Sequence, residues 1–202
     1  MKWKSLLLAV LVAFGFLSAN AQVVEKGDKI LNLGVGLGNA LYSGGGYTGS
    51  VPPISGSLEV VIKDDLFDGK GALGVGGYLG YAAYKWAYSG LVYGAIEKSA
   101  SMVESSGIDY GWKYSNIIIG PRGYLHYNLV ENLDTYIGAM LGYNIVSSKW
   151  YGTGTSIGTA SSGGVIFSGF IGARYFFSEK LGGFAELGSG IAYFNLGVAI
   201  NL

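Results

Sequence analysis

The sequence contains one histidine, His126, and this residue type most directly suggests catalysis. A histidine acting as a general base needs a hydroxyl or carboxyl group within hydrogen-bond reach. No serine or acidic residue lies within two positions of His126 along the chain. We therefore interpret His126 as a structural histidine that points inward near a short turn, and we predict no catalytic residues.

The sequence has few residues or motifs that could bind a metal ion or a phosphate group. The chain has no cysteine and a single histidine, which excludes thiolate and multi-histidine metal sites. Asp64, Asp65 and Asp68 are close together, but their spacing does not match a calcium-binding EF-hand loop. The glycines at 34, 36 and 38 alternate as in a strand and precede no helical pattern, so they do not form a phosphate loop. We predict neither a metal nor a cofactor.

Four charged residues occupy positions that alternate with apolar ones: Glu59, Arg122, Arg174 and Glu186. If these positions face a protein interior, the charges should pair, because an isolated buried charge is very unfavourable. Equal counting from Lys180, within the turn, places Arg174 opposite Glu186 and predicts an ion pair between them. We expect Glu59 and Arg122 to join this network. A structural role is favoured over an ion relay, because small β-barrels are usually filled by side chains.

Three tryptophans each adjoin a lysine where a strand pattern meets a long loop: Lys85-Trp86, Trp112-Lys113 and Lys149-Trp150. Equal counts about residues 131 and 99 place Lys113 opposite both Lys149 and Lys85. Like charges directly opposite each other are destabilising, so an anionic partner is expected. The strand phase puts the lysines outward and the indoles inward, although a bulge could reverse it. We favour an interfacial aromatic belt with snorkelling lysines over a ligand-binding aromatic collar.

The composition limits the class of protein that could position these residues. Hydrophobic side chains make up 50% of the chain and charged ones only 13%. This excludes a disordered chain, which lacks apolar residues. Lys+Arg and Asp+Glu balance at 13 each, which argues against a nucleic-acid partner.

Apolar residues alternate with small or polar ones in eight segments, at residues 31–38, 54–62, 73–83, 117–129, 135–145, 165–177, 181–187 and 194–202. A membrane-spanning strand needs about 9–11 residues, and strands in lipid must form a closed sheet. The pattern predicts an all-β fold, an eight-stranded antiparallel up-and-down transmembrane β-barrel. The inward positions alternate glycine with bulky residues such as Tyr124 and Phe170, so the interior should be filled.

The connections between these segments alternate in length. The longer ones cover residues 39–53, 88–110 and 151–164, whereas the shorter ones cover 63–71, 130–134 and 178–180. Outer-membrane barrels combine long extracellular loops with short periplasmic turns in this way. A soluble β-sandwich or lipocalin-like barrel is the alternative. It is less favoured because the more polar face is mostly glycine, with few of the charges that a water-facing surface carries.

The N-terminus has the features of a secretory signal peptide. Lys2 and Lys4 precede an apolar run, and Ala19-Asn20-Ala21 is a small-residue cleavage signature. The run is too short for a spanning helix, which needs about 20 apolar residues. We predict cleavage of residues 1–21 and a single barrel domain at residues 22–202.

Three stretches carry a resemblance to a known family: the signal-peptide end Ala19-Asn20-Ala21-Gln22, the run Pro52-Pro-Ile-Ser-Gly-Ser-Leu-Glu59, and Phe184-Ala-Glu-Leu-Gly188. The chain resembles the small outer-membrane β-barrel proteins of the porin family, with their OmpX-like and OmpA-transmembrane-like members. The resemblance covers the whole mature chain and implies the barrel fold more specifically than any role.

These observations together predict a non-enzymatic protein of the bacterial outer membrane. A structural or surface-interaction role through the loops at residues 39–53, 88–110 and 151–164 is favoured. The expected partners are outer-membrane lipid and lipopolysaccharide, whose phosphates the outward lysines would meet, and an extracellular ligand at the loops. We expect a monomer. The alternatives are a narrow channel or transporter for small solutes and a lipid-modifying enzyme that uses His126.

Overall fold

The computed structural model describes residues 24–38, 40–41, 47–88, 110–151 and 162–202, so the predicted signal peptide at 1–21 lies outside the described residues. Eight strands follow one another along the chain: β1 (Lys29–Leu37), β2 (Tyr47–Leu66), β3 (Gly71–Tyr88), β4 (Tyr110–Val130), β5 (Leu133–Tyr151), β6 (Gly164–Phe176), β7 (Leu181–Gly188) and β8 (Phe194–Asn201). In the described part of the chain, no helix is long and apolar enough to cross a membrane.

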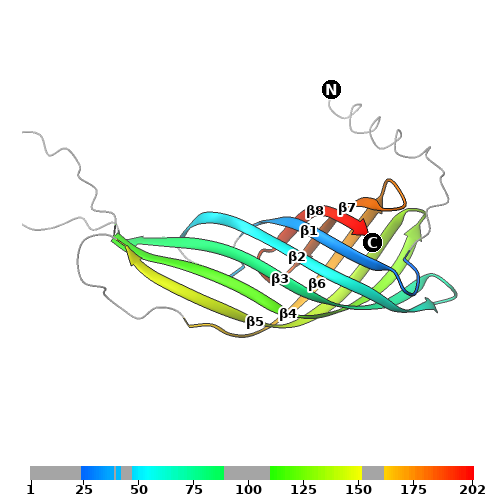
Figure 1. The fold of residues 1–202 in the computed structure, drawn as a ribbon, viewed down its shortest axis with the longest axis horizontal. Helices are drawn as coiled ribbons and strands as arrows, with labels where there is room; N and C mark the ends of the chain where they lie inside the picture. Colours follow the sequence, from blue (N-terminus) through cyan, green and yellow to red (C-terminus); the bar gives the residue numbers. More distant parts are fainter. Residues whose placement is uncertain (1–23, 39, 42–46, 89–109, 152–161) are drawn as a thin grey trace, which may run out of the picture.

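Each strand pairs antiparallel with the next one, and β1 pairs with β8 to close the ring (Figure 1). The closed up-and-down barrel confirms the predicted fold. Closure removes the unpaired sheet edges that would otherwise expose backbone hydrogen-bonding groups.

The strands reach further toward the long loops than the alternation predicts. Strand β2 begins at Tyr47, inside the predicted loop 39–53, and β5 runs on to Tyr151. Pro52 and Pro53 lie within β2, where the register with β3 shifts twice, between Gly49 and Ile54. Proline cannot donate to a strand ladder, and such bulges accommodate it. Strands β2 to β5 therefore extend beyond the four shorter strands at the loop end of the barrel (Figure 1).

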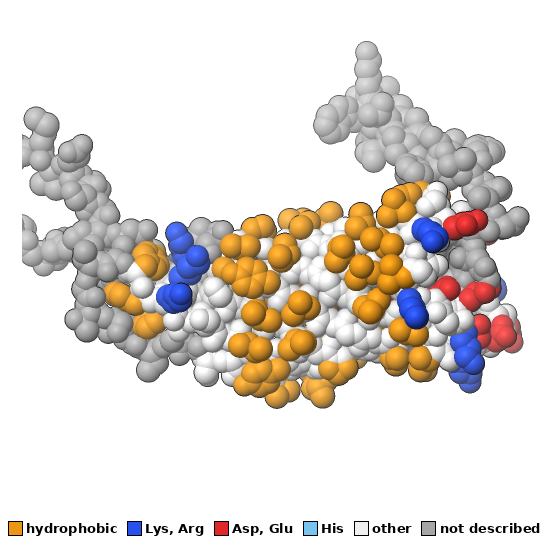
Figure 2. All heavy atoms as spheres, in the orientation of Figure 1, with side chains coloured by type: hydrophobic (Ala, Val, Ile, Leu, Met, Phe, Trp, Pro, Cys, Tyr) orange, Lys and Arg blue, Asp and Glu red, His pale blue; other side chains and the backbone are white. Residues whose placement is uncertain are grey.

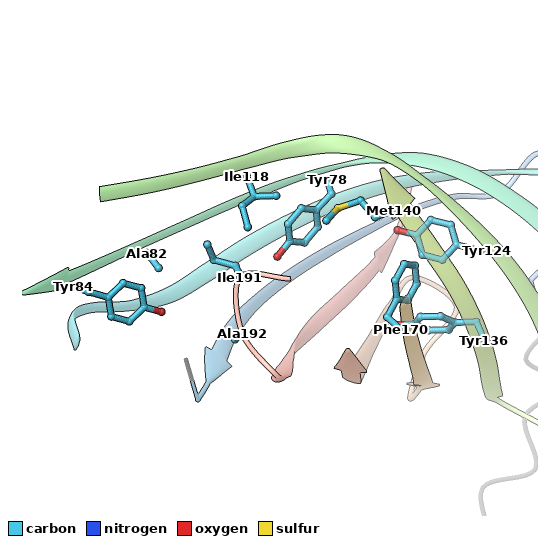
Figure 3. Packing of buried hydrophobic residues seen from close by; sticks show 10 residues of the cluster. All are labelled: Tyr78, Ala82, Tyr84, Ile118, Tyr124, Tyr136, Met140, Phe170, Ile191 and Ala192. Carbon is cyan, nitrogen blue, oxygen red and sulfur yellow. The ribbon is translucent and has the colours of Figure 1, made fainter. Parts of the chain in front are cut away.

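The interior is packed with aromatic and aliphatic side chains. The predicted inward residues Tyr78, Tyr124, Met140, Phe170, Phe176 and Phe184 are all buried. The Phe170 ring lies 5.4 Å from the Tyr124 ring and 6.2 Å from the Tyr136 ring (Figure 3). Nearer the loop end, Ile191 from the β7–β8 connection joins the same cluster. Side chains from several strands thus form a buried core inside the barrel.

The outer face is apolar. The exposed large hydrophobic residues come from every strand and include Leu33, Leu58, Leu79, Ile119, Leu141, Phe167, Leu187 and Val198. These side chains make up the apolar belt of the barrel. On the face that Figure 2 shows, apolar side chains cover the middle of the barrel and charged side chains lie toward its two ends. The predicted alternation of outward apolar and inward small or bulky residues is confirmed.

Candidate functional site

Among the described residues, six charged or ionisable polar ones are buried inside the barrel: Glu59, Arg122, His126, Asp134, Arg174 and Glu186. They include the four predicted interior charges, all at most 5% exposed. The remaining two, His126 and Asp134, were not predicted to take part. Together the six residues form two layers that cross the interior.

The first layer, here called the charge ring, consists of Glu59, His126, Asp134 and Arg174 from β2, β4, β5 and β6. Glu59 accepts hydrogen bonds from Arg174 Nη2 at 2.6 Å and contacts His126 Nε2 at 2.5 Å. Asp134 accepts from Arg174 Nη1 at 2.9 Å and contacts His126 Nδ1 at 2.8 Å. Each residue therefore contacts two others, and the four contacts close a cycle across the barrel.

The charges within the ring balance. Both ring nitrogens of His126 face a carboxylate oxygen, and a histidine that donates from both nitrogens carries a positive charge. Two carboxylates are then matched by one guanidinium and one imidazolium. Such matching is necessary because a buried charge without a partner is strongly destabilising. The ring's residues are at most 1% exposed, so they satisfy one another without solvent.

The second layer is the ion pair of Arg122 with Glu186, whose Nη1 and Oε2 atoms lie 3.0 Å apart. The Arg122 guanidinium lies between two rings, 4.0 Å from the centre of Tyr78 and 4.2 Å from that of Phe170. Both distances fall within the range of cation–π attraction. The Arg122 guanidinium therefore contacts one aromatic ring from β3 and one from β6.

Tyr136 connects the two layers. Its hydroxyl donates to Glu186 at 3.4 Å, and its ring lies 4.3 Å from the Arg174 guanidinium. The polar interior of the barrel is thus a continuous network and not two isolated pairs.

The predicted ion pair between Arg174 and Glu186 is wrong. The β6–β7 turn is centred one residue earlier than predicted, so Arg174 lies opposite Phe184 and Glu186 lies opposite Gly172. Because this moves the pairing by two residues, Glu186 keeps its inward face but loses Arg174 as its direct neighbour. Glu59 joins Arg174 as a partner, while Arg122 joins Glu186.

Two glycines provide the room for these layers. A Cβ atom on Gly74 would come within 2.0 Å of Glu59 Oε1, and one on Gly172 would come within 2.4 Å of the Tyr136 ring. Any larger residue at either position would displace a side chain of the network.

Asp134 is the member that sequence reasoning missed, because the β4–β5 turn was predicted to include it. The turn is shorter: Val130 pairs directly with Leu133, so Asp134 already belongs to β5. It shares the inward parity of Tyr136, and this parity could have identified it. Its position directly opposite Arg174 was not predictable by counting, since a long connection separates β5 from β6.

No group of three or more His, Asp or Glu side chains within the described ranges has a geometry that would hold a metal ion. In the charge ring, the Arg174 guanidinium binds the two carboxylates that could otherwise take part in such a site. The ring is suited to holding four strands together and has no space for a ligand among its members.

At the loop end, the register places Lys113 opposite both Lys85 and Lys149, the arrangement that counting about the turns predicts. All three lysines are exposed on the outer face, and we refer to them as the lysine row. In register, the row lies four residues beyond Tyr81, Ile117 and Ile145 toward the long loops.

The neighbouring tryptophans lie on the other face of the sheet. Trp112 and Trp150 are directly opposite in register, and their rings meet edge to face with centres 5.5 Å apart. They share the parity of the buried residues Tyr84 and Tyr114. This orientation favours the aromatic collar over the lipid-facing belt for these indoles.

An exterior of exposed apolar rows, with the charged network of the strands turned inward, reverses the arrangement of a water-soluble β-barrel. Exposed rows of Leu, Ile, Val and Phe around a closed ring require a hydrocarbon environment, and closure satisfies every spanning backbone group without water. The chain is a transmembrane β-barrel. The expected resemblance to small outer-membrane β-barrel proteins is supported at the level of the fold by this architecture.

No family model and no curated protein matches the chain. Among solved structures, a de novo designed transmembrane β-barrel is 15% identical, with a TM-score of 0.45, covering 90% of this chain and 100% of that chain. Ail, the attachment invasion locus protein of Yersinia pestis, is 10% identical, with a TM-score of 0.42 and coverage of 87% and 95%. Its complex with the heparin analogue sucrose octasulfate gives 13% identity and a TM-score of 0.36. The fold assignment rests on this chain's own strand register.

Proposed function

We propose that this chain is a closed β-barrel of the bacterial outer membrane that conducts no solutes, catalyses no reaction and acts through its loop end. In this proposal the barrel is a rigid anchor that presents the loops between β1 and β2, β3 and β4, and β5 and β6 to the outside. The observation that supports this proposal is the charge ring together with the Arg122–Glu186 pair, because these layers place mutually paired side chains across the interior.

The same layers argue against the channel alternative. A solute passing through the barrel would have to separate Arg174 from Glu59 and Asp134, and breaking a buried pair is unfavourable by about 3–5 kcal/mol. The rings of Tyr124, Tyr136 and Phe170 pack against one another in the same interior. An eight-stranded barrel is just wide enough for such a filling.

The surroundings of His126 support a non-enzymatic role. Its side chain is fully buried, and both of its nitrogens are engaged by carboxylates. A lipid-modifying enzyme would need a base that reaches a lipid substrate, whereas His126 faces the core. A search for altered acylation after incubation with lipopolysaccharide tests this part, and any modification that disappears in His126→Gln would contradict it.

Planar-bilayer recording of the refolded full chain tests the closed interior. We expect no sustained unit conductance steps from the wild-type protein. The double variant Tyr124→Ala with Phe170→Ala, which removes interior rings, should conduct more readily. The matched variant Ile119→Ala with Leu141→Ala removes outward side chains and should stay silent. Stepwise conductance by folded wild-type protein would overturn the proposal.

Membrane localisation is tested separately by fractionation and by gel migration before and after boiling. A folded barrel should migrate differently from the boiled chain and should stay with the outer membrane. A mature chain that dissolves without detergent would contradict the location.

A further inference from the structure

The lysine row concentrates positive charge on the outside of the barrel, and no acidic side chain among the described residues pairs with it. Residues directly opposite on antiparallel strands have Cβ atoms about 4.5–5.5 Å apart, so Lys113 lies close to like charges on both sides. The ion pairs found among the described residues all lie inside the barrel, and none of them includes these three lysines. The ammonium group of Lys85 lies 5.8 Å from the centre of the Tyr151 ring. This ring is neutral and does not neutralise the charge of Lys85.

The polarity of the outer face changes over three successive rows of residues, of which the lysine row is the last. The first row, Tyr81, Ile117 and Ile145, belongs to the apolar belt. The second row consists of Ala83, which is buried, and the more accessible Ser115 and Ser147, and the third is the lysine row. The sequence of surfaces along the strands is therefore apolar, then small and hydroxylated, then cationic.

The spacing of these steps fits the layers of a lipid leaflet. Two residues along a strand span about 7 Å, so the lysine row begins about 13 Å along the strands from the apolar row. At the usual barrel tilt of about 40°, this corresponds to about 10 Å along the membrane normal. The polar interfacial region occupies about 5–8 Å on each side of the hydrocarbon core. The lysine backbone therefore lies just beyond the interfacial region, and a flexible lysine side chain can bring its ammonium group back to lipid phosphates.

The other end of the barrel lacks such a single-sign surface. There, Lys63 adjoins Asp64 and Asp65 in sequence, and Lys180 adjoins Glu179. Charges of both signs are interspersed, so they can compensate one another at the turn end. The lysine row is thus specific to the loop end.

We propose that the lysine row is a binding site for the phosphate groups of membrane lipids in the leaflet at the loop end. The phosphates neutralise three adjacent ammonium groups, Ser115 and Ser147 face the head-group linkage region, and the acyl chains lie along the apolar belt. This site names a partner for the proposed outer-membrane barrel and rests on that location, but it does not require a closed interior.

The site is built on a rigid platform. The β4–β5 register is continuous from Ile119 and Tyr143 to Gly111 and Tyr151, and the Trp112–Trp150 contact braces the same segment from the inner face. Lys113 on β4 and Lys149 on β5 are consequently held at a constant separation. A phosphate group that bridges them needs little reorganisation of the protein.

Native mass spectrometry of the full chain in zwitterionic micelles tests the proposal. The probes are bis-phosphorylated lipid A, its dephosphorylated counterpart, and inositol hexakisphosphate as a soluble polyanion. We expect wild-type protein to retain phosphorylated lipid A and to lose it when the phosphates are removed. Neutralising all three lysines (K85Q, K113Q and K149Q) should weaken this binding on the order of 100-fold, because each basic residue near an anionic lipid surface contributes to binding.

A matched variant carries the same charge change at the turn end, K63Q with K70Q and K180Q, and should bind lipid A like wild type. Replacing the lysine row by arginine should preserve binding. If the triple variant does not refold, the single variant Lys113→Gln replaces it. This variant should bind phosphorylated lipid A more weakly than wild type. Boiled and unboiled gel migration verifies folding in each case.

Three results would overturn the proposal: equal retention of phosphorylated and dephosphorylated lipid, unchanged binding after neutralisation of the row in a folded variant, or binding of inositol hexakisphosphate as tight as that of lipid A. The last result would indicate a site for soluble polyanions. Because the measurement is made in micelles, it is independent of conductance, so an open interior and a missing phosphate site are separate outcomes.

Discussion

The charge ring and the lysine row differ in how their charges are arranged. The ring collects Glu59, Asp134, His126 and Arg174 from four strands and pairs each of these charges inside the barrel. The lysine row places like charges side by side on an exposed surface. In the interior the protein must provide its own counter-charges, whereas at the rim the surroundings can provide them.

This contrast predicts opposite consequences for the removal of a positive charge. In the ring, the loss leaves carboxylates unpaired and buried, which is strongly unfavourable. In the row, the loss relieves repulsion as long as no anionic lipid is bound. Substitutions in the two regions should therefore change stability in opposite directions in the same zwitterionic micelle.

The largest effect is expected for Arg174→Met, which leaves Glu59 and Asp134 without their shared guanidinium. The free energy of unfolding should fall by about 3–5 kcal/mol, the usual result of breaking a buried pair. Urea titration followed by tryptophan fluorescence measures it. Adding Glu59→Gln should recover part of the loss. A decrease of under about 1 kcal/mol would show that the ring does not depend on this charge.

A smaller effect is expected for Gly74→Ala, because the new Cβ would collide with Glu59 Oε1. Overpacking of this kind destabilises by about 1–3 kcal/mol. Gly77→Ala on the same strand is the matched control, since a Cβ added there would have no atom within 4 Å. The two variants should separate clearly in the same urea titration, and equal stability would mean that Glu59 moves away without loss.

The Arg122–Glu186 pair can be isolated by a double-mutant cycle with Arg122→Met and Glu186→Gln. Contacting residues in one network usually show coupling energies of about 0.5–3 kcal/mol. We expect a favourable coupling in this range from urea unfolding of the four proteins. A coupling of zero would indicate that the aromatic rings of Tyr78 and Phe170, and not Glu186, stabilise Arg122.

The smallest effect, and one of opposite sign, is expected for Lys113→Met in phosphate-free zwitterionic micelles. Removing the central charge of the lysine row should raise stability by a few tenths of a kcal/mol, about the size of a cross-strand charge interaction. In micelles that contain lipid A the gain should disappear. A destabilised Lys113→Met variant without lipid A would contradict the repulsion on which the contrast depends.

The local features of the barrel were predictable because a strand's side chains alternate with period two. Leu141 and Met140, which are neighbours in sequence, lie on opposite faces as expected, one exposed and one buried. The short β4–β5 turn also allowed Lys149 to be paired with Lys113 by counting. The same method gave the wrong partner for Arg174, since the β6–β7 turn is centred one residue away from the assumed position.

The amino-acid sequence by itself determines which side chains face in and which face out, because that alternation is a property of each strand. Only the tertiary structure decides which inward charges meet. Glu59 and Arg174 are 115 residues apart on strands that are not neighbours in the ring, and His126 reaches Glu59 past the space left by Gly74. Contacts across the interior depend on ring closure and on the relative stagger of the strands, and no local period encodes either quantity.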